Sequence, residues 1–226
     1  MLIDPDGWDA IYIAFPKYRA NGIPFTGHAG VLLIDNKTGL TKYYEYGRYD
    51  KEGKGLVRNV SVSNVVIGKD GKPTTESLNK VMKQLSDKSG HSGDIEGAYI
   101  ISDKFKEMND YAKSKMSEND NPNRKEYSIT SNNCATFAED VITQDKSVDK
   151  PTSIINTPTN IVDEYQEEGN ARVQYNSKTN STTIGKGNEK DAKIKHNDWY
   201  ENQNIIFVHR INNTYSQYYV IRYMAI

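Results

Sequence analysis

Three strand-like segments near the N-terminus constrain the fold of this chain most strongly. Residues 8–15, 28–34 and 41–49 are rich in the β-branched and aromatic side chains that favour strands. The second and third of these segments flank the turn-forming sequence Asp-Asn-Lys-Thr-Gly, so together they predict a β-hairpin. A fourth strand is expected over residues 57–67. The N-terminal part of the chain is therefore expected to consist mainly of strands, two of which pair as a hairpin.

Helical periodicity follows these strands. Apolar side chains recur at helical spacing, and polar cap residues precede the helical runs. The expected helices cover about residues 74–88, 105–116, 131–142 and 161–168. Further expected elements are strands at 95–101, 205–209 and 215–224, an extended piece at 127–130, and polar hairpins or loops over 169–198.

This order of elements is typical of the α+β class, with strands at both ends of the chain. The length of 226 residues is enough to bury a large core. We expect a single domain over residues 1–226, with a helical insertion at about 68–126 and a C-terminal extension at about 145–226.

The charge balance argues against two classes of partner. The chain carries 29 basic and 30 acidic residues, a formal net charge of -1. Nucleic acids and anionic membranes are therefore not expected as partners. No apolar run approaches the roughly 18 residues of a transmembrane segment, and the acidic N-terminus lacks the features of a signal peptide. We expect synthesis in the cytoplasm and, for any export, a route that does not read such a signal.

The sequence contains a single cysteine, Cys134. One thiol excludes a disulfide framework and a zinc site built on several thiolates. Asn132 and Asn133 precede it, and asparagine is a favoured N-cap, so Cys134 is expected in the first turn of a helix. Unpaired backbone N–H groups there favour a thiolate and could bind an oxyanion. The alternative is a buried thiol that only packs against Phe137 and Ala138.

His28 is the histidine best placed to act as a base. It begins a predicted strand between Gly27 and Ala29, small residues that let another element approach the ring. The alternative is a surface or core histidine without a chemical role. The other histidines are expected to be exposed or structural: His91, His196 and His209. No phosphate-binding loop or metal-binding histidine pattern is present, so no cofactor or metal is expected.

Both candidates lie in motifs that resemble a known family. The sequences Gly-His-Ala-Gly-Val around His28, Glu-Tyr-Gly at 45–47 and Asn-Cys-Ala-Thr-Phe around Cys134 are similar to those of circularly permuted papain-like hydrolases. This branch includes permuted NlpC-type peptidases, PPPDE peptidases and lecithin:retinol acyltransferase-like proteins, and its histidine strand precedes its cysteine helix. The resemblance implies a permuted papain-like fold over about residues 8–142, with an antiparallel sheet packed against the cysteine helix. It also implies Cys134 as nucleophile and His28 as general base.

A third group usually orients the histidine in such sites. The resemblance places it on the strand after the histidine strand, where Glu45, Tyr46 and Arg48 are candidates. Glu45 faces away from the other two because side chains alternate across a strand. We choose Glu45, since a carboxylate would hold the imidazole N–H and stabilise the imidazolium. The alternative for Glu45 is a solvated charge on a strand.

A cysteine and a histidine on this scaffold imply attack on an acyl carbon and an acyl-enzyme intermediate. The leading hypothesis is a peptidoglycan amidase or endopeptidase, with a peptide or peptidoglycan substrate. The alternatives are a lipid acyltransferase or thioesterase, a protein peptidase or isopeptidase, and a binding domain without turnover. The chain is also similar to permuted papain-like effectors of type VI secretion systems. That similarity implies delivery into the periplasm of a target cell and an immunity protein as partner.

Overall fold

The computed structural model describes residues 8–19, 27–50, 53–152 and 157–186. The strands are β1 (Trp8–Phe15), β2 (His28–Asp35), β3 (Thr41–Gly47), β4 (Leu56–Val60), β5 (Ile95–Ser102), β6 (Ala171–Asn176) and β7 (Ser181–Gly185). The helices are α1 (Thr75–Ser89), α2 (Phe105–Ser117), α3 (Cys134–Ile142) and α4 (Pro158–Glu167), with a short 3-10 helix at Glu118–Asp120. The strands expected over 205–209 and 215–224, and His196 and His209 with them, lie outside the described residues.

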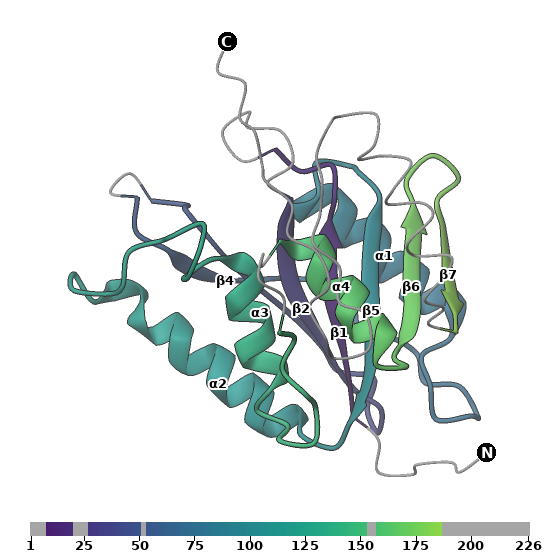
Figure 1. Cartoon of the computed structure of the whole chain (residues 1–226). Coiled ribbons are helices and arrows are strands. Elements are labelled where there is room, and N and C mark those ends of the chain that lie inside the picture. The colour runs from purple at the N-terminus through teal and green to yellow at the C-terminus, as the bar shows by residue number, and fades with distance from the viewer. Residues whose placement is uncertain (1–7, 20–26, 51–52, 153–156, 187–226) are drawn as a thin grey trace, which may run out of the picture. The chain divides into compact units, whose positions relative to one another are not determined.

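The strands form one antiparallel sheet in the order β4-β3-β2-β1-β5-β6-β7. The central strand β1 pairs with β2 on one side and with β5 on the other. Figure 1 shows α2, α3 and α4 in front of this sheet and α1 behind it. The cysteine helix α3 packs against β2 and β3. The predicted combination of helices with an antiparallel sheet is confirmed.

Strand alternation gives the sheet two apolar faces. In β1, Tyr12 faces α2, α3 and α4, whereas its neighbours Ile11 and Ile13 face α1. All of these side chains are fully buried. A shift of one residue in strand pairing would exchange the two faces, so burial on both sides fixes the register. The register in turn fixes where the side chains at the strand ends lie.

The fourth strand is shorter than expected: β4 ends at Val60, whereas the sequence predicts a strand up to residue 67. The chain then leaves β3 and runs along the turn between β2 and β3, where the Val65 N–H donates to the Gly39 carbonyl at 3.0 Å. Gly39 has a φ of +74°, and a Cβ there would lie 2.2 Å from the Val65 carbonyl oxygen. The segment after Val60 thus lies against this turn, which the alternating valines of the sequence do not indicate.

Three other segments can be compared with expectation. The polar region after residue 169 forms a hairpin, as expected, from β6 and β7, and β6 also extends the sheet by pairing with β5. Residues 127–130 are part of a turn closed by the bridge between Ser128 and Asn132, rather than an extended piece. Helix α4 begins at Pro158 because the Thr157 side chain caps it and proline is well suited to the first helical turn.

The segments on either side of α3 complete the same sheet. Residues 68–126 contribute β5 as well as α1 and α2, and the chain after residue 145 contributes α4, β6 and β7. Their interpretation as an insertion and an extension of a papain-like domain stays a proposal. None of the described helices is long and apolar enough to span a membrane.

Candidate active site

Cys134 is the first residue of α3, and Asn133 is the N-cap. The Asn133 Oδ1 accepts from the N–H groups of Ala135 and Thr136 at 2.9 and 3.1 Å. The Thr136 hydroxyl accepts from the Asn133 N–H at 3.0 Å, which completes a capping box. The cap therefore uses two of the N–H groups that we expected to be free for an oxyanion. The Cys134 N–H remains outside the cap.

His28 and Cys134 meet at the end of β2. His28 faces the side of the sheet covered by α1, where its ring stacks on Phe15 with the centroids 6.0 Å apart. Cys134 comes from α3 on the other side. At the strand end the thiol and the imidazole lie close enough for each to shift the pKa of the other. Both residues are buried, each with 5% of its surface exposed.

The two groups stabilise each other in their charged forms. Burial raises the pKa of the Cys134 thiol, but hydrogen bonds from His28, the Ala29 N–H and the Tyr127 hydroxyl outweigh burial and hold that pKa below its ordinary value. Burial lowers the pKa of His28, but Cys134 and Glu45 raise it to about 9. These opposite shifts favour a thiolate beside an imidazolium at neutral pH.

Glu45 lies beside His28 because of the hairpin register. Gly30 pairs with Glu45 across the hairpin, so His28, two residues earlier on β2, shares a face with Glu45. The His28 Nε2 lies 3.1 Å from the Glu45 Oε2, and the Glu45 side chain is 0% exposed. The Glu45 carboxylate thus holds the imidazole ring at Nε2. Tyr46 points to the core beneath α3 and Arg48 is exposed.

Two residues that the sequence reasoning did not select hold Glu45. Arg58 lies opposite Glu45 in the pairing of β3 with β4, and it donates from Nε to Oε1 at 3.0 Å and from a terminal nitrogen to the same oxygen. The Tyr49 hydroxyl donates to Oε1 at 3.0 Å and lies 3.1 Å from His28 Nε2. Burial raises the pKa of Glu45, but His28 and Arg58 lower it to about 2. The carboxylate is therefore ionised.

Tyr127 is a third residue that the sequence did not single out. Its hydroxyl interacts with both the thiol and the backbone N–H of Cys134. Its ring stacks on Tyr46 with the centroids 5.8 Å apart, and Tyr46 in turn packs against Phe137 at 5.9 Å. The hydroxyl of Tyr127 thus lies beside Cys134 at the start of α3.

His91 is exposed, as expected, and it follows the end of α1. Its backbone is left-handed, with a φ of 51°, and its ring packs on Tyr18 at 4.5 Å. Tyr18 also packs on His28 at 5.0 Å, so His91 lies one ring away from the site. Within the described parts of the chain, no group of three or more His, Cys, Asp or Glu side chains is arranged to hold a metal ion.

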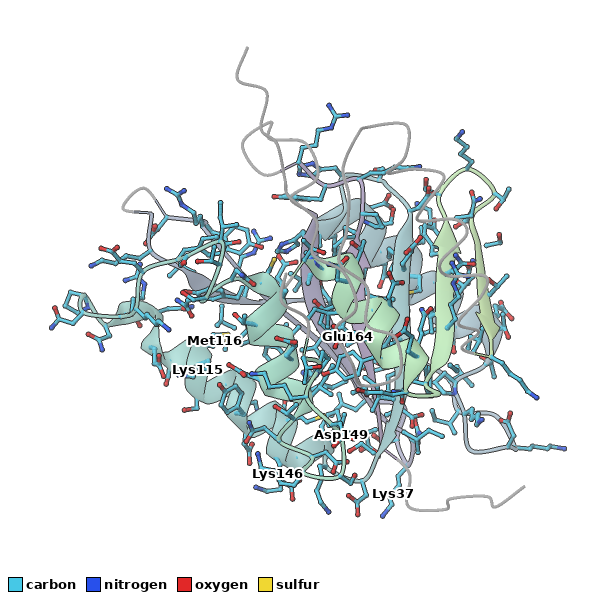
Figure 2. All side chains as sticks on the ribbon, viewed as in Figure 1. Lys37, Lys115, Met116, Lys146, Asp149 and Glu164 are labelled. Carbon is cyan, nitrogen blue, oxygen red and sulfur yellow. The ribbon has the colours of Figure 1, made fainter. Side chains whose placement is uncertain are left out.

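A polar groove of about 210 Å³ lies close to Cys134. We call it the Lys125 groove; its wall includes Asn132, Thr136 and Phe137, which flank Cys134 in the sequence. Other lining residues are Tyr46, Val57, Tyr111, Lys115, Glu118, Asn119, Arg124, Lys125, Ser131 and Asp140, with Gly55. Figure 2 labels Lys115 on α2.

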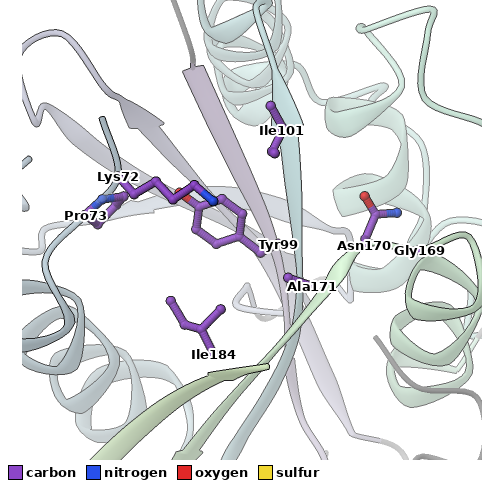
Figure 3. A pocket seen from close by; sticks show the side chains of 8 residues that line it. All are labelled: Lys72, Pro73, Tyr99, Ile101, Gly169, Asn170, Ala171 and Ile184. Carbon is purple, nitrogen blue, oxygen red and sulfur yellow. The ribbon is translucent and has the colours of Figure 1, made fainter. Parts of the chain in front are cut away.

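A separate cavity of about 260 Å³ lies around Tyr99, on the face of the sheet that α1 covers. Figure 3 shows its lining side chains, which include Lys72, Ile101 and Ile184. None of the residues that contact Cys134 or His28 lines this cavity. It is therefore distinct from the candidate active site.

Comparison with known proteins identifies a family and a solved structure. The model of the family described as type VI secretion system effector TseH-like matches residues 3–150. The crystal structure of the type VI secretion system effector TseH is similar, with 34% sequence identity and a TM-score of 0.74 over 80% of this chain and 100% of that chain. The comparison with curated proteins gave no match. The family match contains the segments that carry His28, Glu45 and Cys134.

Proposed function

Because the chain belongs to the TseH-like family of type VI secretion system effectors, we propose that it is an antibacterial cysteine amidase with a permuted papain-like fold. Its substrate is the peptide part of peptidoglycan in the periplasm of a target cell, and an immunity protein protects the producing cell. The family membership supports delivery by a type VI secretion system and an immunity protein as the partner. The observation that carries the chemistry is the buried pair of Cys134 and His28, held by Glu45 and Arg58.

Cys134 is the nucleophile. Its thiolate attacks the carbonyl carbon of the amide, a carbon–sulfur bond forms, and the electron pair of the C=O bond moves onto oxygen. The Cys134 N–H at the start of α3 donates to this oxyanion. The Tyr127 hydroxyl, which lies at the same N–H, turns to donate its proton to the oxyanion as a second hydrogen-bond donor.

His28 moves the protons. As an imidazolium it donates a proton to the leaving nitrogen while the C–N bond breaks, which releases an amine and leaves a thioester on Cys134. The neutral ring then takes a proton from water, and the resulting hydroxide attacks the thioester. The C–S bond breaks, a carboxylic acid leaves, and the thiolate and imidazolium are restored. Glu45 stays ionised throughout and holds the ring.

The lining of the Lys125 groove favours a peptide over a fatty acyl chain. Its wall carries the cations Lys115, Arg124 and Lys125 together with amide and hydroxyl groups. A fatty acyl chain needs a continuous apolar channel beside the nucleophile, whereas a peptide offers carbonyl, amide and carboxylate groups to a polar wall.

Digestion of purified peptidoglycan tests the proposal. Wild type should release soluble fragments in which mass spectrometry finds one new amine and one new carboxylate for each bond cleaved. Cys134→Ala should release none, whereas Lys113→Met, an exposed change on α2 outside the groove, should match wild type. Equal release by wild type and Cys134→Ala would exclude Cys134 as nucleophile. Intact peptidoglycan together with fatty acid released from phospholipid vesicles would assign the site to a lipid hydrolase instead.

A further inference from the structure

The Lys125 groove and the reactive thiol share an aromatic wall. Tyr46 lines the groove and stacks on Tyr127, whose hydroxyl contacts Cys134. Phe137, which packs on Tyr46, lies one turn along α3 from Cys134 and also lines the groove. A peptide whose scissile carbonyl lies at Cys134 therefore reaches the groove within a few residues.

Most charges in the groove are already paired. The Lys115 Nζ lies 2.9 Å from the Glu118 carboxylate, and Arg124 pairs with Asp50. Asp140 pairs with Lys150, which lies outside the groove, at 2.8 Å. These pairs neutralise both acids of the lining and two of its three cations.

Lys125 is the cation that remains. It is exposed, and among the described residues no carboxylate pairs with it. Both residues beside it are anchored: the Arg124 Nε donates to the Gly55 carbonyl at 3.1 Å, and the Glu126 carbonyl accepts from Asn132 at 2.7 Å. Lys125 therefore follows and precedes residues that are tied to the rest of the protein, and it lines the groove as an unpaired cation.

We infer that the Lys125 groove is the subsite for a substrate residue that carries a free carboxylate, and that Lys125 determines specificity by pairing with it. The inference rests on the proposed function, because it names the peptide class that the same site accepts. The apolar part of that residue packs on Tyr46 and Phe137, and its carboxylate meets the Lys125 ammonium. A carboxamide in the same place has no charge to offer.

Two synthetic stem-type peptides, identical except that one carries a free carboxylate and the other the carboxamide, test this inference. Wild type should cleave the carboxylate peptide with a KM about 1.5- to 5-fold lower and a similar kcat, as expected for one exposed ion pair. Added salt should weaken that preference. Lys125→Met should remove the preference and Lys125→Glu should reverse it, whereas Lys113→Met on the exposed face of α2 should keep it.

Calorimetric binding of both peptides to Cys134→Ala separates the subsite from turnover. Tighter binding of the carboxylate peptide, lost when Lys125→Met is added, supports the subsite. Equal binding of the two peptides, or a preference that survives Lys125→Met, overturns it even if wild type cleaves peptidoglycan. Absence of cleavage by wild type together with a Lys125-dependent binding preference would instead contradict the amidase and leave the carboxylate subsite standing.

Discussion

At the scale of single residues, the site is a series of alternating charges that runs from solvent into the protein. Arg58 is 44% exposed at its side chain, whereas Glu45 and His28 are buried. A buried carboxylate without partners costs several kcal/mol, and the hydrogen bonds from Arg58, Tyr49 and His28 offset that cost. The ionised Glu45 then supports an imidazolium, which in turn supports the thiolate. The charged form of each group in this series is therefore stabilised by the group before it.

Titration of the thiol tests this dependence directly. Cys134 is the single cysteine, so the pH dependence of its rate of alkylation by iodoacetamide reports the ionisation of this thiol alone. We expect a midpoint below the ordinary value of about 8.5 in wild type. His28→Gln should move the midpoint above that value, because burial still raises the pKa while the imidazolium is gone. The His91→Gln variant is the control, since His91 contacts Tyr18 rather than Cys134. A midpoint unchanged by His28→Gln would show that the two side chains are not coupled.

At the scale of elements, the β2–β3 hairpin aligns His28 with Glu45, and a glycine makes that alignment possible. A Cβ on Gly30 would lie 2.3 Å from the Tyr43 hydroxyl and 2.7 Å from the Tyr44 carbonyl oxygen. The second of these is backbone of the partner strand, so it cannot rotate away. Gly30 therefore lets β2 and β3 approach each other at the position where Glu45 pairs.

Gly30→Ala should separate the strands at this point. We expect a loss of about 1–3 kcal/mol in the free energy of unfolding, as for other overpacked sites, and a larger relative loss of activity because Glu45 moves from His28. Gly185→Ala is the matched control, since a Cβ on that strand glycine would meet no atom of the described residues within 4 Å. Chemical denaturation and hydrolysis assays measure both effects. A Gly30→Ala variant as stable and active as Gly185→Ala would contradict this account of the hairpin.

The sequence predicts the helices and strands that carry this site better than the contacts between side chains of different elements. Cys134 at a helix start and His28 at a strand start follow from local capping and strand signals, and the structure has both there. Glu45 could be chosen on chemistry, but its distance from His28 depends on the register, which the sequence of a turn does not determine. Arg58 depends on a second register, between β3 and β4. Tyr127 reaches Cys134 through an irregular turn that carries no periodic pattern.

At the scale of the whole molecule, three buried groups make stability depend on pH in different directions. Glu45 has its pKa lowered from 4.5 to about 2, so its contribution is present above pH 4.5 and is lost as the pH falls through 2. His28 has its pKa raised from 6.5 to about 9, so its contribution is present below pH 6.5 and is lost as the pH rises through 9. Glu139 adds a second loss of stability with rising pH, between pH 4.5 and about 7.

Glu139 lies on α3 and is 0% exposed. Among the described residues, neither of its carboxylate oxygens has a hydrogen-bond partner, and the nearby hydroxyls of Tyr12 and Tyr165 have none either. Burial raises its pKa from 4.5 to about 7. Between these two values the unfolded chain loses its proton and the folded chain keeps it, so folding becomes less favourable as the pH rises. The difference amounts to roughly 3 kcal/mol at 1.36 kcal/mol per pH unit.

Glu139→Gln removes this titration while it keeps the size and polarity of the side chain. The fall in the free energy of unfolding between pH 5 and pH 8 should therefore be roughly 2–3 kcal/mol smaller in Glu139→Gln than in wild type. The losses due to His28 are common to both proteins and cancel in the comparison. Urea denaturation at the two pH values measures this fall in the free energy of unfolding for each protein. Glu76→Gln, which changes an exposed carboxyl on α1, should show the same fall as wild type. An equal fall in wild type and Glu139→Gln would mean that Glu139 is already ionised in the folded protein, with a partner for its charge inside the core.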